Sequence, residues 1–385
     1  MSDGKELVAK KFGPAIVSLA NAARAFDAPV RNPLLIKAPG FAFGGTNYLA
    51  MPRASAFVSL IEHFFGMLIL TPIILYRRGF KQIFQTLKEF DRKDWFALIY
   101  VSMGGSALGL FFFLISLGMG NPTVAILLQK TQPLITLAFA AVILKEKPSW
   151  QYYVTLGISL IGVFLITFDE LVKSGQSFNW VGLVAILCSL LAATMWGGST
   201  VFGRRLTEKL NYWDLTFLRY VGGFFFLVVF NGILLTYNNT YFEYLFAGTY
   251  VSPGLYDVSD YMFLSNGIGV YPNVSNSNWP VIACIAYSAV LTGGVLPLAL
   301  YYFGLKRSKA TIAGLAELAF PLIAIFANYF FLGYELTNLQ LVGAGILLLT
   351  VSMLSYVNAK EMAKAKEMEK VKGEKQEQET GKKLK

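Results

Sequence analysis

Two stretches of the sequence decide the fold: AILLQKTQPLITLAFAAVIL, residues 125–144, and AGLAELAFPLIAIFANYFFL, residues 313–332. Each has about the 20 apolar helical residues that a bilayer core of about 30 Å requires. A shift of 188 residues superposes them and places Pro133 on Pro321. The match continues without a gap into the next apolar segment, where Gly157 meets Gly345. The sequence therefore predicts a membrane protein built from two copies of one helical unit.

The overall composition also indicates a membrane protein. Of the 385 residues, 55% are hydrophobic and only 15% are charged, which is too few charges to cover a soluble domain. The net charge of +10 does not indicate nucleic-acid binding, because the basic residues form short clusters between apolar runs. Cys188 and Cys284 lie within apolar runs, and His63 is the single histidine. We therefore predict no disulfide framework, no metal site and no cofactor.

Ten segments are candidates for transmembrane helices. The weakest, residues 34–51, contains Lys37, Pro39 and several glycines, but it lies where the first repeat needs its first helix. The other nine meet the length and hydrophobicity requirement well. They are approximately residues 56–76, 95–117, 123–144, 152–168, 180–201, 215–236, 280–303, 311–332 and 339–357.

The distribution of Lys and Arg predicts the orientation of these helices. If the N-terminus is cytoplasmic, the outer connections contain only Arg53 and Lys173. Cytoplasmic loops retain positive charge, so this asymmetry predicts that both termini are cytoplasmic. The inner connections contain Arg77, Arg78, Lys81, Lys88, Arg92, Lys93, Lys145, Lys147, Arg204, Arg205, Lys209, Lys306, Arg307 and Lys309.

The predicted fold class is all-α and integral to the membrane, with ten transmembrane helices in two five-helix repeats. Because five is an odd number, the repeats insert with opposite orientations, and the substrate site is expected near the midplane. A long extracellular connection, residues 237–278, is either a surface loop or a lid. The expected units are a cytoplasmic N-terminal segment (1–33), the first repeat (34–170), the second repeat (179–357) and a charged cytoplasmic tail (358–385).

The N-terminal segment is expected to be a cytoplasmic or interfacial helix. Its apolar run, residues 15–23, is interrupted by polar residues and is followed by Arg24, Asp27 and Arg31. This pattern does not match a cleavable signal peptide.

Four short motifs resemble the drug/metabolite transporter superfamily, specifically its EamA-type branch of two five-helix repeats. They are WGGST (196–200), FLRYVGG (217–223), AILLQKTQPLI (125–135) and AGLAELAFPLI (313–323). Their order and repetition carry the resemblance, which spans roughly residues 34–357. It implies ATP-independent export or exchange of small metabolites, often amino acids, across the cell membrane.

Lys130 and Glu317 are the leading candidates for substrate binding or coupling. A charged side chain at mid-helix costs about 2.5 to 3.5 kcal/mol on the insertion scale, so each requires an explanation. Gln129 and Gln132 flank Lys130, and the repeat aligns Gln129 with Glu317. Lys130 is expected to attract a substrate carboxylate, and Glu317 an amine or a coupling proton. The structural alternative is a Lys130–Glu317 salt bridge that locks the two halves together.

Several other polar or aromatic residues lie inside predicted helices. His63 is equally consistent with packing and with a place in the pathway, and Trp196 is a candidate for lining the cavity. Asn328 is expected to face protein or water. Arg219 is interpreted as structural, pairing with Asp214 or with backbone carbonyls.

Glycines and prolines inside the helices are expected to act in packing or as hinges. Small residues dominate helix interfaces in lipid, and proline removes a backbone donor. The candidates are Gly44, Gly45, Gly197, Gly198, Pro133 and Pro321.

The predicted function is secondary transport or export of small metabolites, amino acids or related zwitterions first, by alternating access. Organic anions or nucleoside-like metabolites are the alternative substrates. An enzyme or a channel is the alternative class, but the sequence lacks a Walker A motif, HExxH and an aspartate-rich cluster. The expected partners are a small-molecule substrate and the lipid bilayer, without nucleic acid, and a homodimer is left open.

Overall fold

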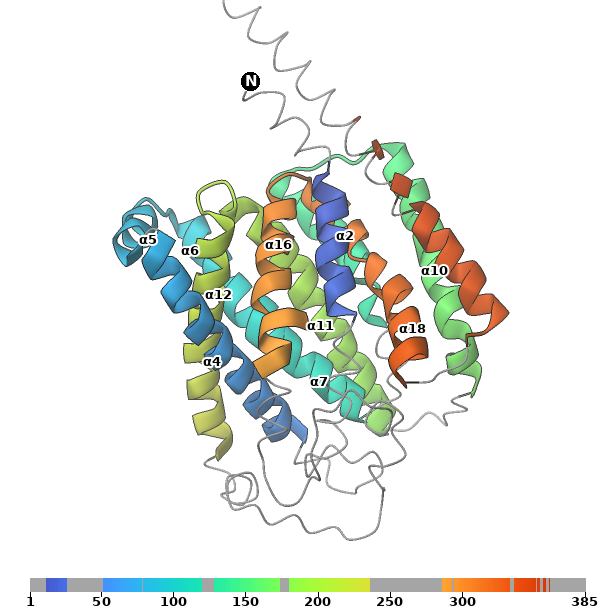
Figure 1. Ribbon diagram of the computed structural model, residues 1–385, viewed down its shortest axis with the longest axis horizontal. Helices are drawn as coiled ribbons and strands as arrows, with labels where there is room; N and C mark the ends of the chain where they lie inside the picture. The colour runs from blue at the N-terminus through green and yellow to red at the C-terminus, as the bar shows by residue number, and fades with distance from the viewer. Residues whose placement is uncertain are drawn as a thin grey trace, which may run out of the picture.

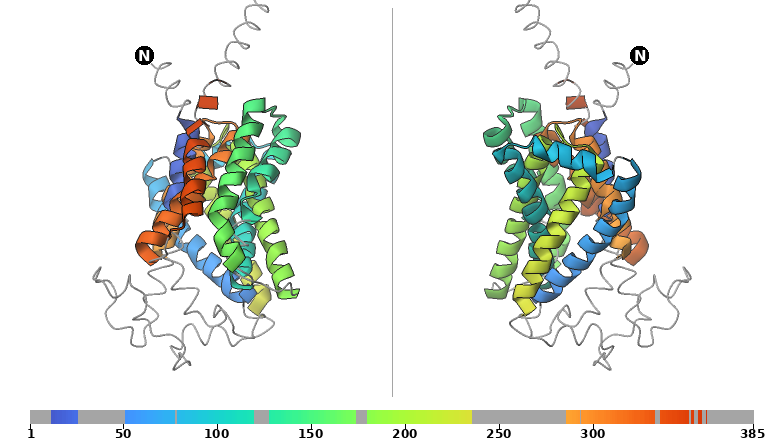
Figure 2. Two further views of the ribbon diagram at one scale, coloured as in Figure 1. Left: turned by 90° about the vertical axis from the view of Figure 1, so that its right-hand side faces the viewer. Right: turned by 90° about the vertical axis from the view of Figure 1, so that its left-hand side faces the viewer.

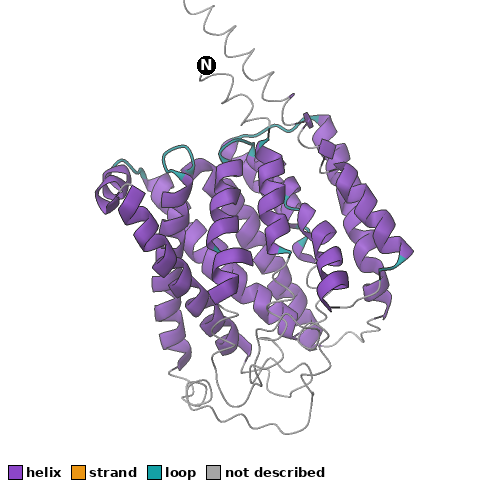
Figure 3. Ribbon diagram, viewed as in Figure 1, coloured by secondary structure: helices purple, strands orange, loops and turns teal. Residues whose placement is uncertain are grey.

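The computed structural model describes residues 12–25, 51–77, 79–119, 128–173, 180–235, 286–292, 294–332 and 336–350, with short pieces up to residue 360. Within these ranges the regular structure is entirely helical, as Figure 3 shows. Six helices are long and apolar enough to cross a membrane: Ser55–Arg77, Arg92–Ser116, Trp150–Phe168, Gly182–Leu206, Tyr212–Leu234 and Ser288–Leu305. The prediction of an all-helical membrane protein is confirmed. The weak segment 34–51 lies outside the described residues.

The helices follow one another with short connections. The first half of the chain contains α2 (Gly13–Arg24), α4 (Met51–Arg77), α5 (Gly79–Lys88), α6 (Arg92–Ile99), η1 (Tyr100–Leu108), α7 (Gly109–Met119), α9 (Gln132–Phe139), η2 (Ala140–Leu144) and α10 (Trp150–Lys173). The second half contains α11 (Trp180–Leu206), α12 (Tyr212–Leu235), η4 (Ser288–Thr292), α16 (Val295–Leu305), α17 (Ala310–Ala316) and α18 (Ala319–Leu332). A further apolar helix covers Asn338–Thr350.

The helices pack into one bundle, shown in three orientations in Figures 1 and 2. Helix α4 packs along α12, and α11 packs against η1, α7 and α9. At one edge, α10 lies against the helix 338–350, where Gly162 and Gly343 each approach the backbone of the other helix. Because glycine has no side chain, the two backbones approach closely, as is common in helix interfaces in lipid.

Two helices of the bundle are interrupted within one residue of positions related by the 188-residue shift. The chain turns at Lys130–Thr131 before α9, and at Glu317–Leu318 between α17 and α18. A proline follows each turn and removes the N–H group that a continuous helix would use. At each turn, backbone hydrogen bonds join residues three apart instead of four. Leu134 N–H donates to the Thr131 carbonyl, and Phe320 N–H donates to the Glu317 carbonyl. The repeated proline thus produces a repeated break.

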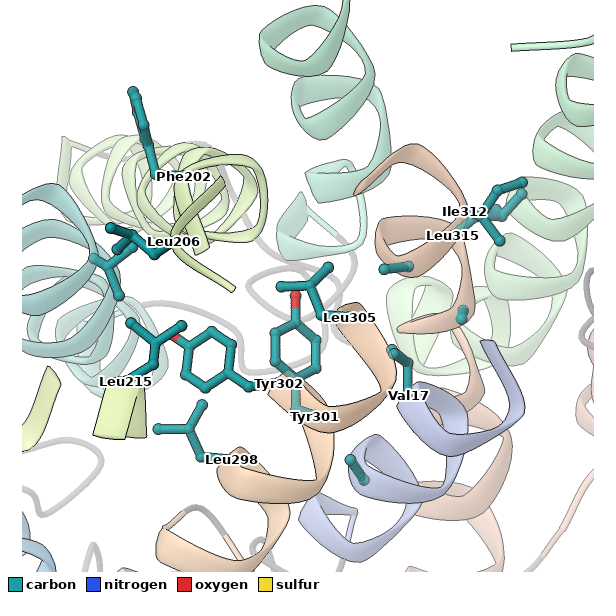
Figure 4. Close-up of a cluster of buried hydrophobic side chains, with 14 of the residues drawn as sticks. Val17, Phe202, Leu206, Leu215, Leu298, Tyr301, Tyr302, Leu305, Ile312 and Leu315 are labelled. Atoms are coloured by element: carbon teal, nitrogen blue, oxygen red, sulfur yellow. The ribbon is translucent and has the colours of Figure 1, made fainter. Parts of the chain in front are cut away.

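The structure differs from the expectation for the N-terminal segment. Helix α2 packs against α16, α17 and α18 as a member of the bundle, with Leu19 on its outer face 62% exposed. Val17 and Ala20 belong to the hydrophobic core, which Figure 4 shows around Val17, Leu305 and Ile312. The reason is local: Pro14 starts the helix, Gly13 lets it approach Gly304, and Ser18 donates to the Ala316 carbonyl at 3.1 Å. Sequence inspection treated the polar residues of this run as evidence against burial.

The contacts of α2 correspond to those of α11. Helix α11 packs against η1–α7 and against the broken helix that contains α9. Helix α2 packs against η4–α16 and against the broken helix that contains α17 and α18. Since the repeat pairs these two broken helices, α2 occupies in one half the place that α11 occupies in the other.

Connections rich in basic residues come together at one end of the bundle. Asp94, only 2% exposed, accepts from Arg205 Nε at 2.9 Å and from Lys209 Nζ at 2.6 Å. Nearby connections are joined as well, because the Glu146 carboxylate accepts from the backbone N–H groups of Ala310 and Thr311. This end is therefore held by charge-assisted bonds between segments far apart in the sequence.

A test of the α2 interface is Gly304→Ala. A methyl group there would lie 2.8 Å from the Gly13 carbonyl oxygen and 3.0 Å from the Val17 nitrogen, so α2 must move. We expect a loss of about 1 to 3 kcal/mol, typical of overpacking, measured as a lower unfolding temperature in detergent. Gly157→Ala is the control, because nothing lies within 4 Å of its added methyl group. Equal stability of the two variants would contradict the close packing of α2.

Candidate functional site

Glu317 lies at the turn between α17 and α18 and is the centre of a polar cluster. Its carboxylate accepts hydrogen bonds from Gln132 Nε2 at 2.6 Å, Tyr301 Oη at 2.8 Å and Thr200 Oγ1 at 3.1 Å. Thr200 and Tyr301 also bond to each other, at 2.7 Å. The three partners come from α9, α11 and α16, so four helices converge on one carboxylate. We call Glu317, Gln132, Thr200 and Tyr301 the Glu317 cluster.

Lys130 lies at the matching turn before α9 and is only 7% exposed. Its ammonium nitrogen is 4.0 Å from the centroid of the Phe320 ring, a cation–π contact. Among the described residues no ion pair joins Lys130 directly to Glu317, so the locking salt bridge considered from the sequence is not the geometry found. The two charges still interact electrostatically. Next to Lys130, the buried Gln129 Oε1 accepts no hydrogen bond in this part of the chain.

Arg219 is the centre of a second group of hydrogen bonds between helices. Its guanidinium donates to the Gly105 carbonyl at 2.6 Å, to Tyr302 Oη at 2.8 Å and to Ser199 Oγ at 3.1 Å. These acceptors lie on η1, α16 and α11, so Arg219 of α12 connects four helices. The expected pairing with carbonyls is thus found at Gly105, and its acceptors are all uncharged. A π-helical turn such as η1 often marks a functional position, and here it presents the carbonyl.

His63 is held in a compact pocket between α4, η1 and α12. Its Nδ1 pairs with the Ser59 carbonyl and its Nε2 with Ser106 Oγ, both at 2.7 Å. The ring packs against Tyr220 at 5.3 Å between centroids, and Gly223 leaves room for it. Both ring nitrogens are therefore occupied, which is the geometry of a packing residue.

Trp196, Gly197 and Gly198 pack against the first half of the chain. Trp196 lies 5.3 Å from Phe113 and beside Gly109, so its ring contacts the η1–α7 segment. An added methyl group at Gly197 would meet Ile135, and one at Gly198 would meet Tyr100. Both glycines therefore permit close helix approach. Pro133 and Pro321 lie at the breaks, while Gly44, Gly45 and the side chain of Asn328 lie outside what the structure describes.

Sequence inspection missed Thr200 and Tyr301 as members of the site. Thr200 ends the quoted WGGST motif, so a signal was present, but the motif was interpreted through its glycines. Tyr301 lies in an apolar run rich in aromatic residues, where tyrosine usually serves as packing. Their proximity to Glu317 depends on how α11 and α16 pack, which no local pattern reveals.

Comparisons with known proteins agree with this architecture. The chain matches the EamA-like transporter family over residues 35–168 and 261–356, more than half of its length. A protein of Fusobacterium nucleatum named riboflavin transporter ImpX is 27% identical over 86% of this chain and its own full length. The uncharacterized transporter sll1164 of Synechocystis is 25% identical over 74% of this chain and 72% of its own. A solved crystal structure with 14% identity, covering 90% of this chain and 98% of its own, has a TM-score of 0.57.

The chain belongs to the EamA-like transporter family. It is a multi-pass protein of the cell membrane that transports small molecules, and the relatives above are named transporters rather than enzymes. The resemblance drawn from the sequence motifs is thereby confirmed.

The packing of His63 yields a prediction. His63→Ala removes both hydrogen bonds of the ring and leaves a cavity beside Tyr220. We expect a loss of about 2 to 4 kcal/mol from the cavity and the unpaired groups, measured by thermal unfolding in detergent. His63→Gln, which restores one hydrogen bond, should recover part of this stability. If transport at permissive temperature is lost in both variants, the side chain acts in the pathway instead.

Proposed function

We propose that this protein is an ATP-independent carrier that moves a small polar metabolite by alternating access. The proposal rests on one observation: the Glu317 cluster joins the two halves of the chain at the two broken helices. Gln132 belongs to the first half, whereas Thr200, Tyr301 and Glu317 belong to the second. Carrier binding sites lie near the midplane, at discontinuous helices between repeats. A channel would instead need a continuous pore lined by like groups.

Within this proposal the chain has ten transmembrane helices in two inverted repeats, with both termini cytoplasmic. The contacts of α2 support its assignment as the first helix of the first repeat, in place of residues 34–51. The connections joined at Asp94, Arg205 and Lys209 form the cytoplasmic end, because positive charge is retained inside. The connection 237–278 then faces outside, and the tail 358–385 lies in the cytoplasm.

The substrate we favour is a flavin-like metabolite. The relative from Fusobacterium nucleatum, matched over its full length, is named a riboflavin transporter. Aromatic rings border the charged groups here, since Phe320 contacts Lys130 and Tyr301 contacts Glu317. Such walls suit a flat ring, because aromatic side chains stack on planar ligands.

An amino acid or a related zwitterion is the second candidate. The observation that favours it is the proximity of Lys130 and Glu317, which carry opposite charges at the two turns. A zwitterion would place its carboxylate near the lysine and its amine near the glutamate. No step of either transport cycle requires enzymatic chemistry, a metal or a cofactor.

Counterflow in proteoliposomes tests the carrier proposal. Vesicles preloaded with a mixed metabolite pool are offered labelled riboflavin, amino acids and organic acids in turn. We expect exchange of one class by the wild type, and a loss of at least about tenfold in Lys130→Ala and in Glu317→Gln, because a fold-change of ten corresponds to about 1.4 kcal/mol.

The control for this experiment is Glu208→Gln, which removes an exposed pair with Arg204 at the cytoplasmic end. It should transport like the wild type, because exposed ion pairs contribute little. Exchange that survives in either Lys130→Ala or Glu317→Gln would exclude that residue from the site. Electrical conductance that does not saturate with substrate concentration would contradict the carrier proposal and indicate a channel.

A further inference from the structure

Arg24 is partly buried and lies on the side of α2 that packs against the bundle. Val17, Ala20 and Asn21 are 0%, 1% and 4% exposed, and Arg24 follows them at the spacing that keeps one helical face. A rise of 1.5 Å per residue places Arg24 about 16 Å along the helix from Gly13, roughly half of the bilayer core. Because Gly13 lies against Arg307, in a basic connection at the end of the bundle, this rise carries Arg24 toward the middle of the bundle.

Arg24 faces the site already described. Its guanidinium carbon is 6.0 Å from the ring centroid of Tyr301, whose hydroxyl donates to Glu317. The charge of Arg24 acts on both Lys130 and Glu317. Helix α2 also contacts the turn itself, because Ser18 donates to the carbonyl of Ala316, the residue before Glu317. The N-terminal helix thus contributes a cation to the cluster.

Arg24 and Lys130 share an unusual property: within the described part of the chain, neither donates a hydrogen bond to any acceptor. Each lies over an aromatic ring instead, Tyr301 and Phe320 respectively. A guanidinium has five N–H donors and an ammonium has three, and buried polar groups are nearly always hydrogen-bonded. Lys130 is 7% exposed, so water from outside does not explain its missing acceptors.

Glu317 does not neutralise the two cations by direct contact. Its oxygens accept from three uncharged side chains, Gln132, Thr200 and Tyr301. With both cations protonated and Glu317 ionised, the cluster would carry an excess of one positive charge, which is costly in a membrane interior. Arg219 differs, because its terminal guanidinium nitrogens donate to three neutral acceptors, although its Nε has no partner among the described residues.

We propose that Arg24 and Lys130 form a subsite for an anionic group, a carboxylate or a phosphate, of the transported molecule. An anionic oxygen between them supplies the missing acceptors and balances the excess charge. Charge-assisted bonds of this kind are about twice as strong as neutral ones, and the arginine fork suits both groups. The inference rests on the proposed function for its location, and it adds a preference for a substrate with an acidic group.

The first experiment measures anion binding without transport. Purified protein in detergent is heated in chloride, acetate or inorganic phosphate at constant ionic strength. Acetate or phosphate should raise the unfolding temperature of the wild type relative to chloride. This rise should fall by at least half in Arg24→Gln and in Lys130→Gln, and Arg24→Lys should keep most of it. Because each variant is compared with itself in chloride, a general loss of stability does not affect the result.

Arg307→Gln is the matched control, since Arg307 also lies over a ring, Phe303 at 3.5 Å, but at the end of α16. It should keep the full rise. No rise in the wild type, or an unchanged rise in Arg24→Gln, would overturn the subsite. A larger rise in unfolding temperature with acetate than with phosphate would indicate that the subsite binds a carboxylate. A larger rise with phosphate would indicate that it binds a phosphate.

A second experiment separates this inference from the proposed function. Counterflow is measured with riboflavin and with riboflavin 5′-phosphate, which differ only by the phosphate. If the subsite binds the anionic group, Arg24→Gln should lower exchange of the phosphate ester by about tenfold more than exchange of riboflavin, a difference of about 1.4 kcal/mol. Equal losses of exchange for both compounds would contradict the anion subsite but would not contradict the proposal that the protein is a carrier. Exchange of neither compound by the wild type would contradict the flavin-like substrate, while the anion-dependent rise still decides the subsite.

Discussion

The structure depends on the loss of one backbone hydrogen bond at each of two prolines, Pro133 and Pro321. In a bilayer interior a freed carbonyl or amide must find a partner within the protein. At the break before Pro321, Phe320 N–H donates to the Glu317 carbonyl instead of to that of Ala316. The Ala316 carbonyl accepts from the hydroxyl of Ser18, which holds α2 against the break. The turns also carry Lys130 and Glu317, whose charged groups are tolerable only where protein surrounds them. One constraint therefore determines both the packing of α2 and the place of the site.

Much of the fold could be predicted from the sequence because the signals are periodic and long. Apolar runs of bilayer length, repeated prolines and clustered basic residues predicted an all-helical membrane protein. The error concerned α2, whose run contains Ser18, Asn21 and Arg24 and so falls below any hydrophobicity threshold. Ser18 is buried with the Ala316 carbonyl of another helix as its acceptor, and Asn21 is buried with the Val17 carbonyl of its own helix as its acceptor. A hydrophobicity scale takes no account of such partners. A tertiary contact, rather than composition, makes α2 part of the bundle.

The candidate site was predicted in part for a similar reason. A lysine and a glutamate inside apolar runs are conspicuous, because each costs energy in lipid. Thr200 and Tyr301 are not conspicuous, since hydroxyls occur in many transmembrane helices as packing residues. The sequence also suggested that Lys130 and Glu317 pair directly, yet Glu317 binds three neutral donors and Lys130 faces Phe320. Opposite charges at matching depths predict proximity, but the side chains between them decide which atoms touch.

The distribution of bonds within the Glu317 cluster bears on how a carrier could cycle. Thr200 and Tyr301 bind Glu317 from the same half of the chain, whereas Gln132 is its partner from the other half. Side-chain hydrogen bonds in membrane proteins average about 0.6 kcal/mol and reach about 1.7 kcal/mol. A substrate group that replaced Gln132 would break the one bond of this cluster between the halves at small cost, while Glu317 stays oriented by its other two bonds. At the end of the bundle, Asp94 instead holds two cations from the other half by charge-assisted bonds. In the proposed carrier cycle, opening that end would break these stronger bonds.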